Sequence, residues 1–327
     1  MASRNLIIIH RGEDYRRDFD EIAGRVASLD PDIAVFCGTP RSRRVMPDER
    51  WEHPTLTVAL LQSFMTEIRR GPILKNRQIH KPGQYRIFAD AGLPFPPALP
   101  FRPGMKLDPI MFGEFVVIKP SDPNFGSHGR GVHLFRRRKL EGMSLQDFPR
   151  GHDLHKDPGG FLVQRFIDIG RHIPLYRVLS LFGAPLYCWF AREKLPQPPI
   201  EGSDEVIEKL RITNNGNFRE RFLCSEQDVL DLSVRVGNAF PDIPILGMDI
   251  MREERTGKLY VLECNPGGNT WHFSARETAG IRRELGGASM VGQKKGELLG
   301  RQKMVDQFGA FDRAAEVLVK KVRELAA

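Results

Sequence analysis

Apolar positions recur with two different periods in the first quarter of the chain. Phe19, Ile22, Val26 and Leu29 follow one another at steps of three and four, which predicts a helix over Tyr15–Leu29. Short apolar runs bounded by polar or turn-forming residues are typical of buried strands. Such runs stand at Asn5–His10, Ile33–Cys37 and Leu56–Leu60, and Gln62–Arg70 is expected to be a further helix or the continuation of the last strand. Residues 1–74 are therefore predicted to form a small open parallel sheet with helices.

Beyond residue 74 the pattern predicts many strands and fewer helices. Strands are expected at Phe115–Ile118, Val132–Phe135, Phe161–Ile167, Tyr176–Phe182, Leu186–Ala191, Leu246–Met251 and Leu259–Cys264, and helices at Gly83–Ala91, Gln227–Phe240 and Phe308–Leu325. Residues 194–217 are expected to form a long functional or mobile loop. The predicted fold class is α/β (α+β), with an N-terminal α/β domain (1–74), a linker region (75–112), a small β-rich lid (113–167) and a C-terminal subdomain (168–327).

Composition narrows the class of protein. Among 327 residues, 41% are hydrophobic and 28% charged, which is typical of a globular protein that is not embedded in a membrane. The four cysteines form no CxxC pair, which argues against a zinc ribbon or a disulfide framework and favours a reducing cytoplasm. No 18-residue apolar run is present, so no membrane association is expected. The net charge of +8 fits an anionic small-molecule pocket as well as nucleic acid, since the basic residues are scattered.

The stretch Phe115–Gly131 carries the first candidate chemistry. Its predicted strand delivers Lys119, and Pro120 ends the strand because it has no N–H to donate. A loop with small polar and glycine residues follows, namely Gly126, Ser127, Gly129 and Gly131. Bare backbone N–H groups beside an ammonium suit a polyphosphate. The alternative interpretation is an ordinary flexible hairpin with a surface lysine.

Two acids on the last pair of predicted strands form a second candidate site. Asp249 and Glu263 both lie within apolar strands, and Asn265 follows Glu263 by two residues and so points to the same face. If the two strands pair in a suitable register, these oxygens converge into a site of the kind that Mg²⁺ prefers. The alternative is a pair of carboxylates bound to nearby arginines.

In this order the segments resemble the ATP-grasp superfamily of carboxylate–amine ligases, which includes D-alanine–D-alanine ligase, glutathione synthetase and the ribosomal-protein glutamate ligase. The resemblance covers about residues 72–275. Lys81, before a helix that ends in Ala-Gly-Leu-Pro-Phe-Pro-Pro, is similar to the family's first ATP lysine, and Lys119 to the second. By the same resemblance, Phe125–Gly131 would fold over the phosphates. Asp249, Glu263 and Asn265 would hold the metal.

The resemblance also implies a nucleoside site and catalytic arginines. The hinge strand would read adenine through its backbone at Gln164, Arg165, Phe166, Ile167 and Asp168. Arg177 and Arg192 fall where family members carry arginines. Two departures stand out: Gln164 replaces the usual glutamate, and Arg171 lies near the place of the usual ribose-binding acid, for which Asp168 is the nearest candidate.

The implied activity is an ATP-dependent ligase. A carboxylate would become an acyl phosphate and then join an amine, with two Mg²⁺ (or Mn²⁺) and ATP as cofactors and Arg192 holding the transferred phosphate. Small-molecule carboxylates and amines would be the partners, without nucleic acid or membrane, and the oligomeric state, a dimer included, stays open. Two alternatives remain, a phosphotransferase on the same fold and a non-catalytic nucleotide-binding protein. Trp271–Phe273 would either line the acceptor pocket or pack against the C-terminal helices.

Overall fold

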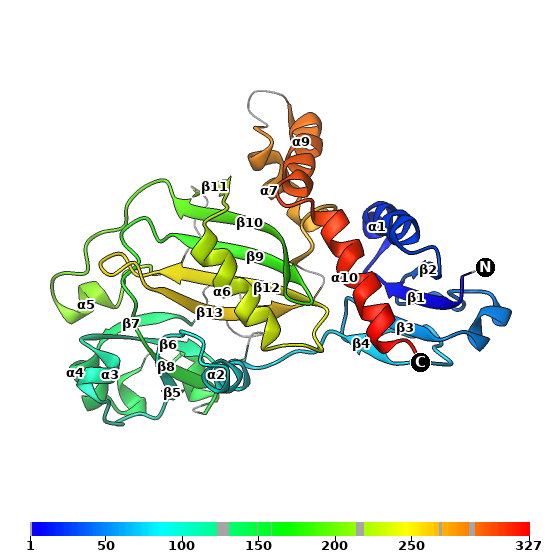
Figure 1. Ribbon diagram of the computed structural model, residues 1–327. Coiled ribbons are helices and arrows are strands. Elements are labelled where there is room, and N and C mark those ends of the chain that lie inside the picture. Colours follow the sequence, from blue (N-terminus) through cyan, green and yellow to red (C-terminus); the bar gives the residue numbers. More distant parts are fainter. Residues whose placement is uncertain are drawn as a thin grey trace.

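The computed structural model describes residues 2–122, 131–148, 150–157, 159–213, 219–267, 270–287 and 292–327. Three sheets organise these residues (Figure 1). A parallel N-terminal sheet is followed along the chain by two antiparallel ones, which we call the lid sheet and the central sheet. This order confirms the predicted α/β (α+β) class. Among the described residues, none of the helices could span a lipid bilayer.

The N-terminal sheet has four parallel strands in the order β2-β1-β3-β4. The strands are β1 (Arg4–Ile9), β2 (Ile33–Gly38), β3 (Thr55–Ala59) and β4 (Ile73–Lys75), and helix α1 (Arg16–Leu29) joins the first two. Leu6–Ile9 are fully or almost fully buried, because helices cover one face of the sheet and the segment after β3 covers the other. The C-terminal helix α10 (Ala310–Leu325) packs beside α1 on this unit.

The prediction of a helix or a strand continuation over Gln62–Arg70 is wrong. This segment is irregular, and its Met65 N–H donates to the carbonyl of Pro40 at 2.8 Å while the Thr66 hydroxyl donates to the carbonyl of Thr39 at 3.0 Å. Phe64 and Ile68 pack against the apolar face of the sheet. Contacts with another loop thus replace the hydrogen bonds within the segment that a helix would need.

The lid sheet is antiparallel, with the order β5-β8-β6-β7. Its strands are β5 (Ala98–Pro100), β6 (Phe115–Pro120), β7 (His133–Arg136) and β8 (Phe161–Arg165). Helices α3 (Pro109–Phe112) and α4 (Arg137–Gly142) supply apolar residues to one face, and α2 (Lys81–Asp90) lies between this sheet and the central sheet. The short 3-10 helices Leu145–Asp147 and Asp153–His155 follow α4.

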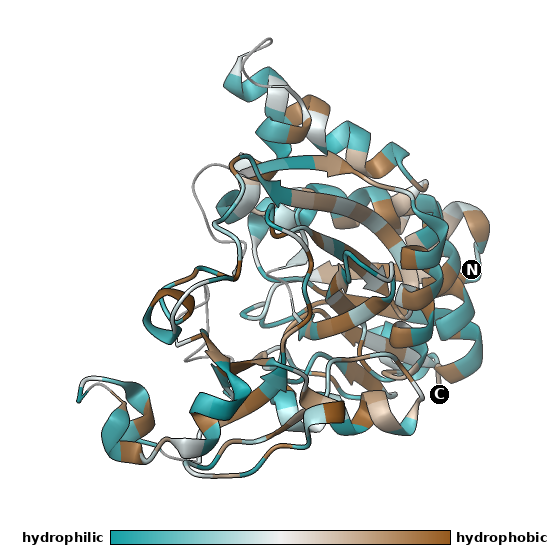
Figure 2. Cartoon of the chain, turned by 90° about the vertical axis from the view of Figure 1, so that its left-hand side faces the viewer, coloured by the Kyte–Doolittle hydropathy of each residue, from teal (hydrophilic) through white to brown (hydrophobic). Residues whose placement is uncertain are grey.

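The central sheet has five strands in the order β11-β10-β9-β12-β13. They are β9 (Leu175–Leu181), β10 (Ala184–Glu193), β11 (Arg219–Leu223), β12 (Ile245–Arg252) and β13 (Leu259–Pro266), and α6 (Gln227–Asn238) covers one face. Further helices are α5 (Asp204–Ile207), α7 (Ala279–Leu285) and α9 (Gln293–Asp306). The sequence pattern predicts none of these three, nor β11. The strands are mainly hydrophobic in composition, and many peripheral turns are hydrophilic (Figure 2).

Trp271 and Phe273 belong to the core. Both are fully buried between the central sheet and the N-terminal unit, where Trp271 stacks with Phe19 and Phe311 and Phe273 meets Phe311 edge to face. The Trp271 indole N–H donates to the carboxylate of Asp18 at 2.8 Å. Of the two interpretations, packing is therefore the one that the contacts of these two rings support.

Candidate functional site

The register of the central sheet brings the two predicted acids together. Asp249 on β12 stands directly opposite Glu263 on β13, and Arg177 on β9 stands opposite Asp249 from the other side. Asn265 pairs with Gly247, two residues before Asp249, so its side chain shares the face of both acids. One row across three strands therefore carries a guanidinium and two carboxylates.

Each acid has a cationic partner within the protein. The Arg177 guanidinium donates to Asp249 Oδ2 at 2.8 Å, and its Nε also contacts the other oxygen. The Lys81 ammonium lies 3.5 Å from Glu263 Oε2, and the Asn265 amide lies 3.5 Å from Glu263 Oε1. Asp249 is thus bound to an arginine, as in the alternative interpretation of the sequence, whereas the cation beside Glu263 is a lysine.

Two buried lysines come from different elements. Lys81 opens α2, and its backbone N–H reaches the carbonyl of Ser121 just after β6. Lys119 on β6 places its ammonium 5.4 Å from the centre of the Tyr85 ring, whose hydroxyl accepts a hydrogen bond from Gln164 at 3.1 Å. Lys81 and Lys119 are each only 6% exposed. With Arg177, Asp249, Glu263 and Asn265 they form what we call the charged cluster.

Burial and mutual charge shift the protonation of this cluster. Burial, and then repulsion by Lys81, lowers the pKa of Lys119 to about 7, although Glu263 opposes the change. Burial raises the pKa of Asp249 to about 6 despite the adjacent guanidinium of Arg177. Burial also acts to raise the pKa of Glu263, but Lys81, Lys119 and Arg177 together hold it below the usual range. Lys119 is therefore a buried cation whose charged form lacks sufficient negative charge nearby.

The donor set fits a hard divalent cation. Two carboxylates and one amide on a single sheet face offer oxygen ligands, the type that Mg²⁺ or Mn²⁺ takes. Within the described ranges, no group of three or more His, Cys, Asp or Glu residues is arranged to hold a metal by itself. Metal binding would accordingly need Asn265, water or a phosphate as further ligands, and Asp249 would have to exchange its contact with Arg177.

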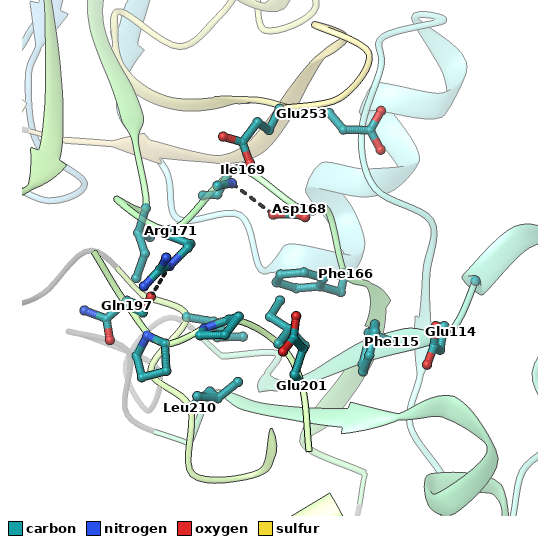
Figure 3. Close-up of a pocket in the computed structure, with 18 of the residues that line it drawn as sticks. Glu114, Phe115, Phe166, Asp168, Ile169, Arg171, Gln197, Glu201, Leu210 and Glu253 are labelled. Carbon is teal, nitrogen blue, oxygen red and sulfur yellow. Dashed lines mark hydrogen bonds between the residues drawn. The ribbon is translucent and has the colours of Figure 1, made fainter. Parts of the chain in front are cut away.

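A cavity of about 530 Å³ lies beside the hinge between the lid and central sheets. Phe115, Arg165, Phe166, Asp168 and Arg171 contribute to its walls, and neither lysine nor acid of the charged cluster does. In Figure 3, Phe166 projects into the cavity, and the Arg171 guanidinium donates to the carbonyl of Gln197 at 2.6 Å. Of the predicted nucleoside residues, Gln164 and Ile167 do not line this cavity, and Gln164 contacts Tyr85 beside Lys119 instead.

The hinge backbone is partly occupied. The N–H groups of Arg165 and Phe166 donate to the carbonyls of Pro97 and Phe115, at 2.8 and 3.1 Å. Ile167 is buried against the end of the central sheet. The Asp168 carboxylate accepts the N–H of Gly170. A base at this hinge would have to use the carbonyls or the remaining N–H groups.

Arg192 is not brought into the charged cluster. It lies three residues after Trp189, the partner of Arg177 in the sheet, and so on the opposite face. Its exposed guanidinium binds Glu220 at 2.6 Å and lies over the Phe222 ring. Arg177, the other predicted catalytic arginine, is in the cluster.

The glycine-rich loop is described only at its end. Gly131 has a φ of +69°, and a Cβ there would lie 3.0 Å from the Pro120 ring. This geometry favours glycine at the return into the lid sheet. The other predicted phosphate-binding residues of the loop, Gly126, Ser127 and Gly129, lie outside the described residues.

Arg221 and Trp189 on the same sheet face were missed from the sequence, whereas His272 belongs to the candidate segment Trp271–Phe273. Trp189 lies between the guanidinium groups of Arg177 and Arg221, at 5.8 and 5.6 Å from the ring centre, and Arg221 forms an ion pair with Glu284 of α7. The buried His272 approaches the hydroxyl of Tyr187 at 2.9 Å. The sequence contains no usable signal for Arg221, because strand β11, which carries it, has no apolar run that would predict a strand.

Comparison with known proteins gives structural likenesses only. No family model and no curated protein match the chain. D-alanine–D-alanine ligase from Bacillus anthracis matches at 13% identity, with 93% of this chain and 99% of that one covered and a TM-score of 0.43.

Two further solved structures match to a similar degree. The ATP-grasp ligase PsnB in complex with a minimal precursor is 14% identical, with 92% of this chain and 100% of that one covered and a TM-score of 0.45. The macrocyclase MdnC from Microcystis aeruginosa MRC, bound to the precursor peptide MdnA, is 10% identical, with 90% of this chain and 99% of that one covered and a TM-score of 0.46. With TM-scores below 0.5, these likenesses carry no argument about activity, and a function has to be argued from the site itself.

Proposed function

We propose that the protein is an ATP- and Mg²⁺-dependent ligase of the ATP-grasp type, which activates a carboxylate as an acyl phosphate and joins it to an amine. The observation that carries the proposal is the charged cluster. It holds Lys81 and Lys119 almost without exposure next to Glu263, and lowers the pKa of Lys119 to about 7. Such a cation is stabilised when an anion arrives, and a polyphosphate supplies several negative oxygens.

Each residue of the cluster has a proposed task. Lys81 and Lys119 bind the phosphates from the lid side, and Asp249, Glu263 and Asn265 would hold Mg²⁺ from the side of the central sheet. The metal would neutralise the phosphate oxygens when a carboxylate attacks. Arg177, which donates to Asp249, would be free to stabilise developing negative charge if a metal took its place at that carboxylate. The nucleoside is assigned to the hinge cavity.

The proposal is tested by an ADP-release screen with hydroxylamine. Purified protein is incubated with ATP and Mg²⁺ and with pools of amino acids, dipeptides and small organic acids. An acyl phosphate is trapped by hydroxylamine as a hydroxamate, so we expect ADP and hydroxamate together from one pool. Lys119→Met should abolish both, and Arg192→Met, on the opposite face, should leave both nearly unchanged.

Two results would contradict the proposal. ADP that forms with an acceptor but without any hydroxamate would mean phosphate transfer to another group, such as a hydroxyl. Failure of the wild-type protein to bind Mg²⁺·AMPPNP at millimolar concentration, by calorimetry, would remove the nucleotide altogether.

A further inference from the structure

An unusually long connection joins two neighbouring strands of the central sheet. β10 ends at Glu193 and β11 begins at Arg219, so 219 − 193 − 1 = 25 residues connect two antiparallel neighbours. Such pairs are commonly joined by about two to five residues. We call its described part, residues 194–213, the strap. At its start, the N–H of Gln197 donates to the carbonyl of Arg171 at 2.7 Å, beside the hinge.

The strap crosses from the central sheet to the lid sheet. Ile207, at the end of α5, is fully buried in a cluster with Val117 of β6 and Leu134 of β7. Ile200, Leu210 and Ile212 pack around them.

Ion pairs hold the same segment at its edge. Asp204 contacts Arg136 at 3.0 Å, and Glu208 contacts Lys139. These four side chains are each 27–33% exposed. A short helix is therefore seated on the lid by an apolar contact, with partly solvated ion pairs beside it.

The covered face is the one that carries the phosphate lysine. Side chains alternate along β6, so Phe115, Val117 and Lys119 share one face. Phe115 lines the hinge cavity, whereas Lys119 belongs to the charged cluster. The four steps between them span about 13 Å at roughly 3.3 Å per residue, and Val117 lies midway. Ile207 belongs to one apolar cluster with Val117, and Ile200 and Leu210 of the strap line the hinge cavity, so the strap meets this path between the cavity and the lysines.

We propose that the strap is an internal gate of the nucleotide site. This inference rests on the proposed function: a nucleotide with its base in the hinge cavity and its phosphates at Lys119 must pass over Val117, so Ile207 has to leave. The measured affinity is then the affinity of the open state reduced by the fraction of molecules that are open. The gate lowers nucleotide affinity without any residue of the charged cluster taking part.

The test compares two substitutions on one helix turn. Ile207→Asn places a polar amide in the apolar contact and should tighten the Kd for Mg²⁺·AMPPNP by about tenfold, because the closed state loses much of its burial energy. Val206→Asn is the matched control, since Val206 is a neighbouring β-branched residue that is 48% exposed. It should change the Kd by less than twofold. Thermal unfolding of both variants shows whether each still folds.

A double variant tests the strap without a change in the apolar core. Asp204→Asn together with Glu208→Gln removes the ion pairs to the lid and leaves Ile207 intact, so the Kd should tighten by a smaller factor, about twofold to threefold. Hydrogen exchange of the wild-type protein gives an independent readout. On addition of AMPPNP, amides of residues 204–210 should lose protection as the strap leaves the lid.

The outcomes separate the gate from the proposed function. Strap residues already line the hinge cavity, so the question is whether Ile207 leaves the lid. Equal Kd values for wild type and Ile207→Asn, weaker binding by Ile207→Asn, or increased protection of residues 204–210 would mean that the strap stays in place as a fixed wall and would overturn the gate alone. If neither protein binds AMPPNP at millimolar concentration, the proposed function fails and the gate fails with it.

Discussion

Replacement of Lys119 by methionine should stabilise the free protein and abolish nucleotide binding. Methionine is unbranched and flexible, so it can follow the buried path of the lysine stem and keep its apolar contacts. What is lost is an ammonium that is 6% exposed and close to the centre of the Tyr85 ring. Opposite effects on stability and on binding are expected of a residue held in an unfavourable charge state for function.

The magnitude follows from the pKa of Lys119, about 7 in the folded protein against an ordinary value of 10.5. The difference is 10.5 − 7 = 3.5 units, and about 1.4 kcal/mol per unit gives an upper bound near 5 kcal/mol. The cost is complete below pH 7, where the lysine is charged in both the folded and the unfolded state. It declines as pH rises from 7 to 10.5, because the unfolded chain then binds more protons than the folded protein.

Half of that bound, about 2 kcal/mol, is a reasonable expectation at pH 6.5, since the substitution also removes a positive neighbour of Glu263. At about 2.1 cal/mol/K of unfolding entropy per residue, a chain of 327 residues would show a rise in Tm of roughly 3 °C. The assay is calorimetric unfolding of Lys119→Met, of wild type and of a surface control, Lys320→Met, at pH 6.5 and 9.5. The gain should shrink at the higher pH, and the control should not move.

The companion measurement is the Kd for Mg²⁺·AMPPNP between pH 6 and 9. In the wild type, affinity should decline above pH 7, because the free protein must then regain the proton on Lys119 before phosphate binds. A lower Tm for Lys119→Met at pH 6.5, with pH-independent binding in the wild type, would refute the reasoning and indicate that Lys119 is adequately paired without ligand.

Three further predictions concern other parts of the molecule. Glu263→Gln should remove activity and lower the free energy of unfolding by about 1–3 kcal/mol at pH 7, because a carboxylate with a depressed pKa is lost; unchanged stability in urea unfolding would contradict this. Arg177→Met should cost about 3 kcal/mol by the same assay, since it leaves a buried carboxylate without its cation, whereas the exposed Arg192→Met should cost less than about 1 kcal/mol. Gly300→Ala should lower the free energy of unfolding by at least about 2 kcal/mol, because its Cβ would lie 1.8 Å from a carbonyl oxygen. Gly24→Ala, at a helical position with open space around it, should raise the free energy of unfolding slightly. Similar Tm shifts for both variants would contradict this packing.

Periodicity along the chain was sufficient to locate most of the strands that carry candidate chemistry. Lys119, Asp249 and Glu263 each lie in a strand that its apolar run predicts, because burial of a strand requires a local sequence that can be read without the rest of the fold. Helices with one clear apolar stripe, such as α1 and α10, were predicted for the same reason. Segment 62–70 and helix α9 were not, since long-range hydrogen bonds decide the first and the second has no clear stripe.

Which of those side chains meet depends on how distant strands pair. The register of β12 on β13 places Asp249 opposite Glu263, and a slip of one residue would have sent one acid to the other face. The same parity separates Arg177 from Arg192, although both arginines lie on one hairpin. Ile207 contacts the lid because its connection runs from the central sheet to the lid sheet. No local sequence pattern predicts which sheet such a connection packs against. Local patterns thus place the candidate residues in strands, whereas strand register and long-range packing bring them into one site, because both depend on elements distant along the chain.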